Sequence, residues 1–534
     1  MKLLITNIFF TFLYTGALNS QITFNRADTL LFEASLATSV IEGDSCYYVS
    51  GVYVDGNQDN FVIDGSYINK VDFLTGESKD LILFVDSTGQ KTFDHWRNNL
   101  KKNPDGNFTV SGYKREIGKP LIPYILKFDN KGKIIYQSFL QGFTDNEFDI
   151  DADYLILKDS CILIATICER NDQGDFPATE ICLFKLDIKG EILWTKKIED
   201  FDTRDFIGEM KLAPNGNVIL FGSKSLHHLD RHPLTWAQII EIDQDGEVIK
   251  HWISETQDSL SRVQSGIIHE DGSFTIATSK SIEYYPDQFN IFNPVVISLD
   301  NNFVQQWKYY EIINMDSLYT SRLQINKIIQ DENNNGTYFI GIFHFVDESN
   351  LDNQSDHVGY IVKLNAQGES EWKRYYQFYG EIDNEYHEFR DLIKTKDNGF
   401  LICGEANDHS NNSVRVSKPQ RSWLIKLDEH GCLVPGCHLP VNTTTTFQEK
   451  NHLRFKALPN PIQNELNVFV YPNPSFKRAT LQILDLNGKL LYSYPIQIDN
   501  LTLSIDSSNF PKGMYILSYL ENGHLMQTEK IIKS

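Results

Sequence analysis

The chain has 534 residues, of which 41% are hydrophobic and 22% charged, so its composition is globular rather than disordered. It carries 49 Lys and Arg against 71 Asp and Glu, a formal net charge of −22. So acidic a chain repels phosphates unless it has a local basic patch, and we find none, so we predict no nucleic-acid partner. Aromatic residues make up 12%, and together with many short Asn, Asp and Gly turns they favour an all-β fold.

Residues 1–20 predict a secretory signal peptide. Lys2 precedes an apolar run over residues 3–14, and small residues follow at Ala17 and Ser20. The run is shorter than the roughly 20 residues that cross a bilayer, and no later segment approaches that length. We therefore expect a protein without a transmembrane segment that is secreted or attached to the outer cell surface.

The chain has seven cysteines. Cys432 and Cys437 lie in a turn-rich segment whose ends can come close, and we predict a structural disulfide between them. Cys161 and Cys403 lie in apolar, strand-like runs and are expected in the core. No Cys-x-x-Cys pair exists, so neither a zinc ribbon nor a thioredoxin-like redox centre has support.

A repeated pattern fills the middle of the chain. Its first half is a polar turn followed by an alternating apolar strand that ends on a small residue. The copies are Asp105–Gly112, Asn215–Gly222, Asp271–Thr278, Asn335–Gly341 and Asn398–Gly404, with degenerate copies ending at Gly51 and Thr166. The second half is a strand that ends on a triplet, a tight turn and another strand. The triplets end at Asp72, Asp129, Asp187, Asp243, Asp300, Asn365 and Asp428. The turn residues are Gly76, Gly132, Gly190, Gly246, Gly368 and Gly431, with Asn302 in the fifth copy.

Each half of the repeat predicts a β-hairpin, because Asp or Asn caps the turn and Gly supplies positive φ. Seven copies between Ser45 and Cys437 give a mean period of about 56 residues, which fits a four-stranded propeller blade with long loops. Seven such sheets arranged radially bury both faces of each sheet. We predict a seven-bladed β-propeller over residues 21–437; six to eight blades would also fit, and β-sandwiches in series are the alternative.

Lys185, Asp187, Gly190 and Trp194 form the motif Lys-x-Asp-x-x-Gly-x-x-x-Trp. In this motif the repeat resembles secreted β-propeller repeat proteins of Bacteroidetes-type bacteria. The resemblance implies the same ring of blades.

The composition changes after Cys437. A polar, Thr-rich stretch predicts a linker over residues 438–456, and short alternating strands then predict a small Ig-like β-sandwich over residues 457–534. Its most distinctive residues are Pro459, Asn460, Pro461, Asp485, Asn487, Gly488, Pro511, Gly513, Tyr515 and Lys530. In these residues the segment resembles the type A C-terminal sorting domain of type IX secretion. The resemblance implies the type IX machinery as a partner; the alternative is an accessory sandwich that binds sugar or protein.

Candidate metal sites are weak. Three segments carry clustered ligand types: His227, His228, Asp230 and His232; the acidic run 145–153; and Asp331–Gly336. The first could bind zinc or copper and the others calcium, but solvated loops and turns explain all three. No nucleophile elbow, P-loop or His-Glu-x-x-His motif occurs. We predict no catalytic, cofactor or metal residues.

These patterns favour a non-enzymatic binding or adhesion module for a glycan or a protein. Its ligand would contact the long loops 279–294, 342–357 and 405–421. The first of these loops carries four aromatic residues that could stack on sugar rings: Tyr284, Tyr285, Phe289 and Phe292. The alternative is an extracellular polysaccharide hydrolase or lyase, which would place at least two carboxylates roughly 5–10 Å apart in the central funnel. A third reading is a structural spacer without a ligand.

Overall fold

The structure is a computed structural model. It describes residues 21–27, 30, 32, 34–54, 65–84, 91–94, 99–115, 121–141, 148–169, 179–198, 203–226, 235–255, 260, 262–281, 292–310, 324–346, 355–378, 385–408, 420–433, 437, 455–458, 461–462, 464–470, 479–484, 490–496, 502–521 and 524–533. These residues form strands and turns and contain no helix.

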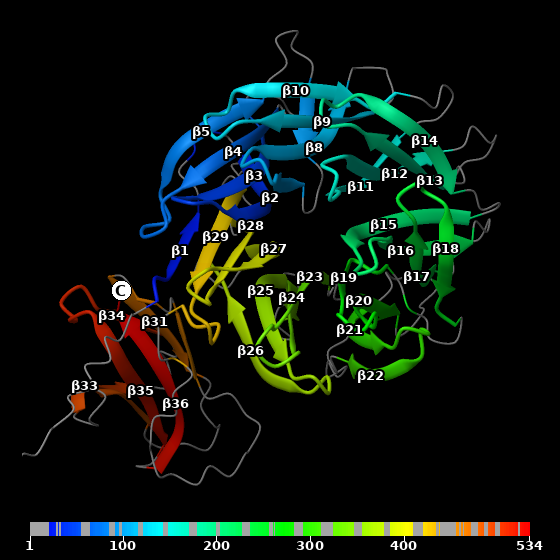
Figure 1. Cartoon of the computed structure of the whole chain (residues 1–534). Helices are drawn as coiled ribbons and strands as arrows, with labels where there is room; N and C mark the ends of the chain where they lie inside the picture. Colours follow the sequence, from blue (N-terminus) through cyan, green and yellow to red (C-terminus); the bar gives the residue numbers. More distant parts are fainter. Residues whose placement is uncertain are drawn as a thin grey trace, which may run out of the picture.

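Seven antiparallel sheets follow one another around a ring (Figure 1). The strands of each blade are given from the centre outward: blade 1 is β2 (Ala34–Glu42), β3 (Tyr47–Val54), β4 (Gly65–Val71) and β5 (Ser78–Phe84), and blade 2 is β6 (Lys91–Asp94) with β7 (Leu100–Lys102), then β8 (Phe108–Arg115), β9 (Ile122–Phe128) and β10 (Ile134–Phe139). Blade 3 is β11 (Phe148–Ile156), β12 (Ile162–Glu169), β13 (Thr179–Leu186) and β14 (Ile192–Ile198); blade 4 is β15 (Thr203–Leu212), β16 (Val218–Leu226), β17 (Thr235–Ile242) and β18 (Val248–Ile253); and blade 5 is β19 (Ser265–Ile268), β20 (Phe274–Ser281), β21 (Phe292–Leu299) and β22 (Gln305–Tyr310). Blade 6 is β23 (Gln324–Gln330), β24 (Thr337–Val346), β25 (Ser355–Leu364) and β26 (Ser370–Tyr376), and blade 7 is β27 (Glu385–Lys394), β28 (Phe400–Asp408), β29 (Arg421–Leu427) and β1 (Phe24–Ala27). The prediction of a seven-bladed β-propeller is confirmed.

Blade 7 takes its outermost strand from the other end of the propeller. β1 pairs antiparallel with β29, and Phe24 lies opposite Lys426. The same register places Trp194 opposite Lys185 in blade 3 and Trp372 opposite Lys363 in blade 6. Phe24 is therefore the aromatic residue of the seventh blade, and the ring is closed by hydrogen bonds between strands from the two ends of the propeller.

The Asp of each triplet folds the turn that follows it. In blade 2, Oδ1 of Asp129 accepts hydrogen bonds from the backbone N–H groups of Lys131 and Lys133, both at 2.9 Å. Asp187, Asp243, Asp300, Asn365 and Asp428 make the same pair of bonds. The prediction that Asn302 replaces glycine in blade 5 is wrong: Phe303, three residues after Asp300, has the positive φ of 64°.

The turn glycine of one blade lies against a side chain of the preceding blade. A Cβ on Gly246 would lie 2.8 Å from Cη2 of Trp194, so only a glycine fits there. The other pairs are Phe24 with Gly76, Ile82 with Gly132, Tyr136 with Gly190, Trp307 with Gly368 and Trp372 with Gly431. Between blades 4 and 5, Phe303 stacks on Trp252 instead, with ring centroids 6.0 Å apart. The glycine and the aromatic residue of the repeat are thus two halves of one contact between blades.

The two ends of each blade differ in the length of their connections. The first and third connections are tight turns, such as those between Glu42 and Tyr47 and between Val71 and Ser78. The second connections, such as 282–291 and 409–420, are longer and lie almost wholly outside the described residues. Because the strands are antiparallel, the strand ends that lead into the long connections share one face of the disc. The predicted loops with Tyr284, Tyr285 and Phe289 fall on these undescribed segments, and of Phe292 only the backbone in β21 is described.

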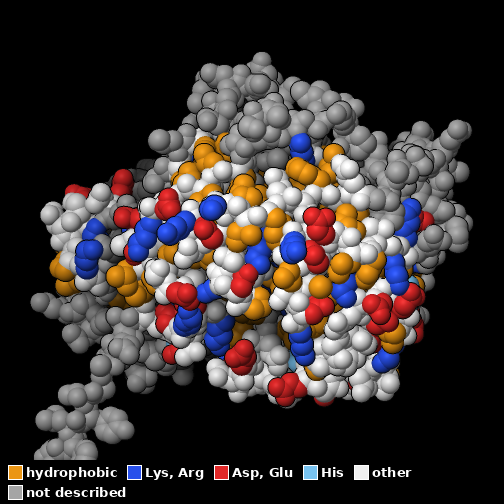
Figure 2. Space-filling model, turned by 45° about the horizontal axis from the view of Figure 1, so that its top comes forward, with side chains coloured by type: hydrophobic (Ala, Val, Ile, Leu, Met, Phe, Trp, Pro, Cys, Tyr) orange, Lys and Arg blue, Asp and Glu red, His pale blue; other side chains and the backbone are white. Residues whose placement is uncertain are grey.

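The outermost strands expose apolar side chains, among them Ile135, Leu193 and Ile249. Figure 2 shows hydrophobic side chains interspersed with both signs of charge over the described surface in that view. The net negative charge of the chain is therefore not gathered on this face.

The C-terminal strands form a separate unit outside the ring (Figure 1). One sheet has the order β30 (Phe455–Leu458), β31 (Glu465–Val470), β34 (Thr502–Asp506); the other has the order β33 (Leu490–Ile496), β32 (Ala479–Leu484), β35 (Gly513–Glu521), β36 (His524–Lys533). Leu466 and Ile505 of the first sheet share one buried cluster with Leu481 and Tyr519 of the second. This packing of two sheets is the predicted small β-sandwich. Most of the predicted linker, 438–456, lies outside the described residues, and β30 begins at Phe455.

Two disulfides are present. Cys432 and Cys437 are bonded across the last tight turn, with Cα atoms 5.6 Å apart. Cys168 and Cys182 join β12 to β13, with Cα atoms 6.0 Å apart, a pair that was not predicted from the sequence. Cys403 is buried as expected, whereas Cys161 is only half-buried, because it follows directly on a turn.

Candidate functional site

One position in each blade recurs beside the central axis. The first half of each repeat ends on a small residue. In every blade, one residue lies opposite the residue just before that small residue, or accepts a hydrogen bond from it. These residues are Ser39, Asn99, Asp153, Glu209, Ser265, Lys327 and Asp391. Six are buried, and the Lys327 side chain is 11% exposed. We call these seven residues the inner ring.

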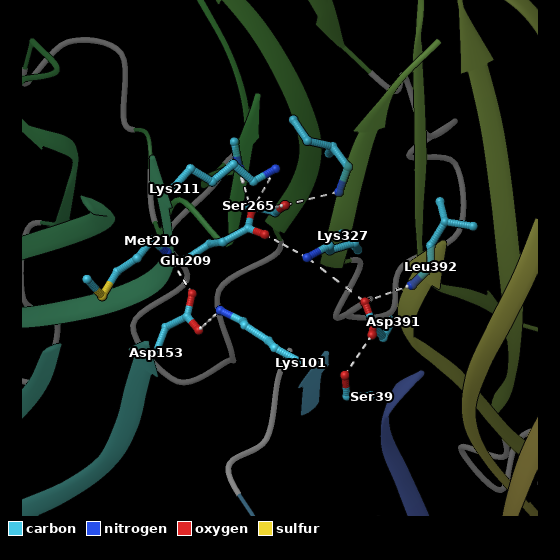
Figure 3. Close-up of polar contacts among 12 residues, drawn as sticks. Ser39, Lys101, Asp153, Glu209, Met210, Lys211, Ser265, Lys327, Asp391 and Leu392 are labelled. Carbon is cyan, nitrogen blue, oxygen red and sulfur yellow. Dashed lines mark hydrogen bonds and ion pairs between the residues drawn. The ribbon is translucent and has the colours of Figure 1, made fainter. Parts of the chain in front are cut away.

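Charged side chains of the inner ring pair across the centre of the propeller (Figure 3). Nζ of Lys327 in blade 6 lies 2.6 Å from Oε1 of Glu209 in blade 4 and 3.9 Å from Oδ1 of Asp391 in blade 7. Nζ of Lys101 lies 3.0 Å from Oδ1 of Asp153. Lys327 thus links blade 7, which follows its own blade, with blade 4, which is two blades away, and only a position near the centre of the ring allows both contacts.

The same carboxylates also bind the backbone of the next blade. Oδ2 of Asp153 accepts the N–H of Met210 at 2.7 Å, and Oε2 of Glu209 accepts that of Gly266 at 3.1 Å. Oδ2 of Asp391 accepts the N–H of Val40 at 2.9 Å, across the junction where the ring closes. Each donor directly follows an inner-ring residue, so the bonds join neighbouring blades in one repeated geometry.

Burial and charge set the protonation of the inner ring. Burial would raise the pKa of Glu209, but Lys211 and Lys327 outweigh it and hold that pKa at about 2. Burial would lower the pKa of Lys327, yet Glu209 and Asp391 raise it. For Asp153, burial prevails over Lys101 and raises the pKa. Glu209 and Lys327 are therefore held as an ion pair.

A second charged cluster lies in blade 7, before Asp391 on β27. Nη2 of Arg390 lies 2.9 Å from Oε2 of Glu388 and 2.5 Å from Oε1 of Glu405. Tyr386 also donates to Glu388, at 2.7 Å. Burial raises the pKa of Glu405 to about 7 against the opposing effect of Arg390. Two carboxylates that share one guanidinium, one with a perturbed pKa, are the kind of pair found in acid–base sites and also in structural networks.

A small cavity lies beside Glu209, Lys327 and Asp391 of the inner ring. It has a volume of about 10 Å³ and is lined by Gly208, Glu209, Gln264, Asn326, Lys327, Arg390 and Asp391. That volume holds about one water molecule. This cavity is therefore too small for a ligand larger than water.

The candidate metal ligands are not brought together in the described structure. His227, His228, Asp230 and His232 lie outside the described residues. Of the acidic run, Asp153 joins the inner ring; Asp331 is bonded to Tyr338 at 2.9 Å and paired with Lys363 at 3.2 Å, as a capped turn would be. Among the described residues, no group of three or more His, Cys, Asp or Glu side chains could hold a metal ion.

Five of the ten residues singled out in the C-terminal segment lie among the described residues. Oη of Tyr515 donates to the carbonyl oxygen of Pro511 at 2.6 Å, which fixes the turn before β35, and Gly513 begins that strand. Nζ of Lys530 reaches the carbonyl oxygen of Cys437 at 3.5 Å, so this lysine touches the end of the propeller. Pro461 lies between β30 and β31. The remaining five, Pro459, Asn460, Asp485, Asn487 and Gly488, fall outside the described residues.

Residues 456–534 match the family model described as a secretion system C-terminal sorting domain. This segment is a type IX secretion sorting domain. The sorting domain addresses the protein to the cell surface or to secretion. The described part of the chain contains no helix that could span a membrane.

A comparison of this chain with curated proteins found no match. Several solved structures have a similar shape. A protein of unknown function from Dyadobacter fermentans is 12% identical, with 77% of this chain and 98% of that chain covered and a TM-score of 0.41. An α-L-arabinofuranosidase from Fusarium graminearum is 10% identical, with 75% and 97% covered and a TM-score of 0.38. An α-L-arabinanase from Penicillium chrysogenum is 11% identical, with 62% and 93% covered and a TM-score of 0.37.

The inner ring was not predicted from the sequence, although a signal for it exists. Each inner-ring residue lies 12 to 14 residues before the small residue that ends its repeat motif, as Glu209 does before Gly222. A polar residue recurs at that spacing in all seven blades and marks the position. The pairing of Lys327 with Glu209 carried no local signal, because the two residues are 118 positions apart.

Proposed function

We propose that the protein is a secreted or surface-attached binding module without catalytic activity, which holds a glycan or a protein on the propeller face that carries the long connections. The observation that carries this proposal is that Asp153, Glu209 and Asp391 each bind a backbone N–H of the next blade. Carboxylates occupied in this way stabilise the ring and are not free to act on a substrate.

The unequal connections support the choice of face. Tight turns of fixed geometry occupy one end of every blade, and the longer second connections start from the other. Loops carried by a rigid scaffold are where binding residues concentrate, since they vary in length and side chain without cost to the core. The charge of the chain disfavours a polyanionic ligand, so neutral glycans and proteins are the preferred classes.

The test uses the mature chain, residues 21–534, on a glycan array and in parallel hydrolysis assays with a panel of polysaccharides. The proposal predicts saturable binding to at least one ligand with no release of reducing sugar or unsaturated product. Release of product from any polysaccharide would contradict it.

One observation favours a second candidate, an extracellular polysaccharide hydrolase. Glu388 and Glu405 share Arg390, and a pKa of about 7 for Glu405 would suit a general acid. If the assays detect hydrolysis, Glu405→Gln should abolish it, while Glu209→Gln should leave the turnover of the folded fraction unchanged. Hydrolysis that survives Glu405→Gln would exclude this pair as the catalytic residues.

A further inference from the structure

A cavity lies between blade 7 and blade 1, where the two ends of the propeller meet. Its volume is about 300 Å³, at the lower end of the range for small-molecule sites. It is lined by Arg26, Ala27, Ala37, Val49, Tyr67, Asn69, Val71, Gly76, Glu77, Ser78, Ser422, Trp423 and Leu424. We call it the seam pocket.

The other blades show what normally fills this space. Asn69 lies three residues before Asp72, the Asp that opens its turn. The residues at that position in the other six blades are all buried and apolar: Leu126, Phe184, Ile240, Ile297, Val362 and Ile425. Asn69 is 6% exposed, so an amide stands where the repeat otherwise places core. A buried amide is a costly replacement for leucine unless it has partners.

A second substitution in the repeat enlarges the same space. Ala37 lies two residues before the inner-ring residue Ser39. The buried residues at that position in blades 4, 5, 6 and 7 are Ile207, Val263, Ile325 and Phe389. Blade 1 thus has the smaller side chain at one wall of the pocket and the polar side chain at another. Both departures from the repeat occur at one interface between blades and face one cavity.

The amide of Asn69 is held with its donor side unused. Its Oδ1 accepts a hydrogen bond from Oγ of Ser78 at 2.6 Å. Within the described part of the chain its Nδ2 has no acceptor, although it lines the cavity. Tyr67, two residues before Asn69 on β4, hydrogen-bonds to Ser422 of β29 across the interface between the blades. The lining of the pocket therefore offers an amide donor and hydroxyl groups beside the apolar side chains of Val49, Val71 and Leu424.

Opposite charges flank the mouth of the seam pocket. Arg26 is exposed and is anchored by a bond from its Nε to the carbonyl oxygen of Thr75 at 3.1 Å. Glu77 is also exposed and lies on the blade 1 side. Because Arg26 and Glu77 carry opposite charges, they favour a ligand without net charge. They also favour groups that both donate and accept hydrogen bonds.

We propose that the seam pocket binds one unit of a neutral sugar. A hydroxyl can accept from Asn69 or Arg26 and can also donate to Glu77, while the C–H faces of a sugar ring suit the apolar walls. The site is separate from the face proposed above for the main ligand. Its occupant would touch both ends of the propeller and so stabilise the closed ring.

The test is binding of neutral monosaccharides to the mature chain, with arabinose, xylose, glucose, galactose and N-acetylglucosamine as probes, measured by saturation-transfer NMR and calorimetry. Asn69→Leu and Ala37→Ile restore the residue types of the other blades and should fold at least as stably as the wild type. The matched control is Lys79→Ala. Lys79 lies beside Ser78 on β5, its side chain is exposed, and it forms an ion pair with Asp72.

The proposal predicts that at least one probe binds the wild type and Lys79→Ala with equal affinity, and that both filling variants lose at least tenfold in affinity. The proposal is overturned if no probe binds the wild type, or if binding survives in Asn69→Leu. These variants do not change the propeller face that carries the long connections, so neither result tests ligand binding there. The glycan array therefore remains an independent test of the proposed function.

Discussion

Gly368 of blade 6 lies directly against the indole ring of Trp307 in blade 5, so close that a Cβ on Gly368 would be 2.3 Å from Cε3. The φ of Gly368 is +80°, which also disfavours any other residue. One glycine therefore serves both the turn within its blade and the contact with the preceding blade.

This relationship predicts different costs for two glycine substitutions. Gly106 has a φ of +82°, and a Cβ added there would meet no heavy atom within 4 Å, so Gly106→Ala should cost only the backbone strain, about 1–2 kcal/mol. Gly368→Ala adds a clash with a rigid ring and should cost about 1–3 kcal/mol more. Equilibrium unfolding of both variants in urea measures the difference, and equal losses would show that the inter-blade contact carries no energy.

Blade 4 has a reversed polar pair that can be tested by exchange. In blade 2, Lys127 pairs with Asp105 at 2.6 Å; in blade 4, Glu241 accepts from Asn215 at 3.0 Å and from Asn217 at 2.6 Å. Glu241→Lys should therefore lower the free energy of unfolding by about 1–2 kcal/mol. Adding Asn215→Asp recreates the blade 2 pair and should recover most of the loss in thermal unfolding. A double variant no more stable than Glu241→Lys would refute the equivalence of the two pairs.

Local turn chemistry made the blades predictable from the sequence. The Asp or Asn that begins the third turn of each blade and the positive-φ residue after it act within a few residues, so seven turns revealed seven blades. Closure by β1 and the inner ring could not be predicted in the same way, since β1 and β29 lie at opposite ends of the propeller and Lys327 pairs across the channel. Aligning the triplets in the sequence can reveal the polar Asn69, but not the seam pocket, because only the fold brings Asn69, Ala37 and β29 to one cavity.

The blade 7 cluster predicts a pH dependence of stability. Burial raises the pKa of Glu405 from 4.5 in the unfolded chain to about 7, so the folded state binds more protons between these values. Stability should therefore fall as pH rises from about 4.5 to 7, by up to about 3 kcal/mol from this group. Glu405→Gln should remove that part of the slope in unfolding measured at several pH values. Asp205, whose pKa burial also raises to about 7, remains in the variant and accounts for a residual slope. An unchanged slope would contradict the assignment.

The sorting domain makes a prediction in cells. A chain that lacks residues 457–534 should cross the inner membrane but accumulate in the periplasm, because nothing remains to address it to the outer membrane. Fractionation and protease accessibility of intact cells distinguish the two locations. The matched control is Asn509→Ala, which changes one exposed side chain of the β-sandwich that is not among the ten residues singled out above. Surface display of the truncated chain would show that export follows another signal.

The central claim is that the inner-ring carboxylates hold the blades together. It is tested most directly by a double-mutant cycle between blades 4 and 6, with Glu209→Gln, Lys327→Met and the double variant compared by equilibrium unfolding. The account predicts a coupling energy of about 1 kcal/mol or more between these two residues, since Nζ of Lys327 lies 2.6 Å from Oε1 of Glu209 and both side chains are largely shielded from solvent. Losses that simply add would contradict it.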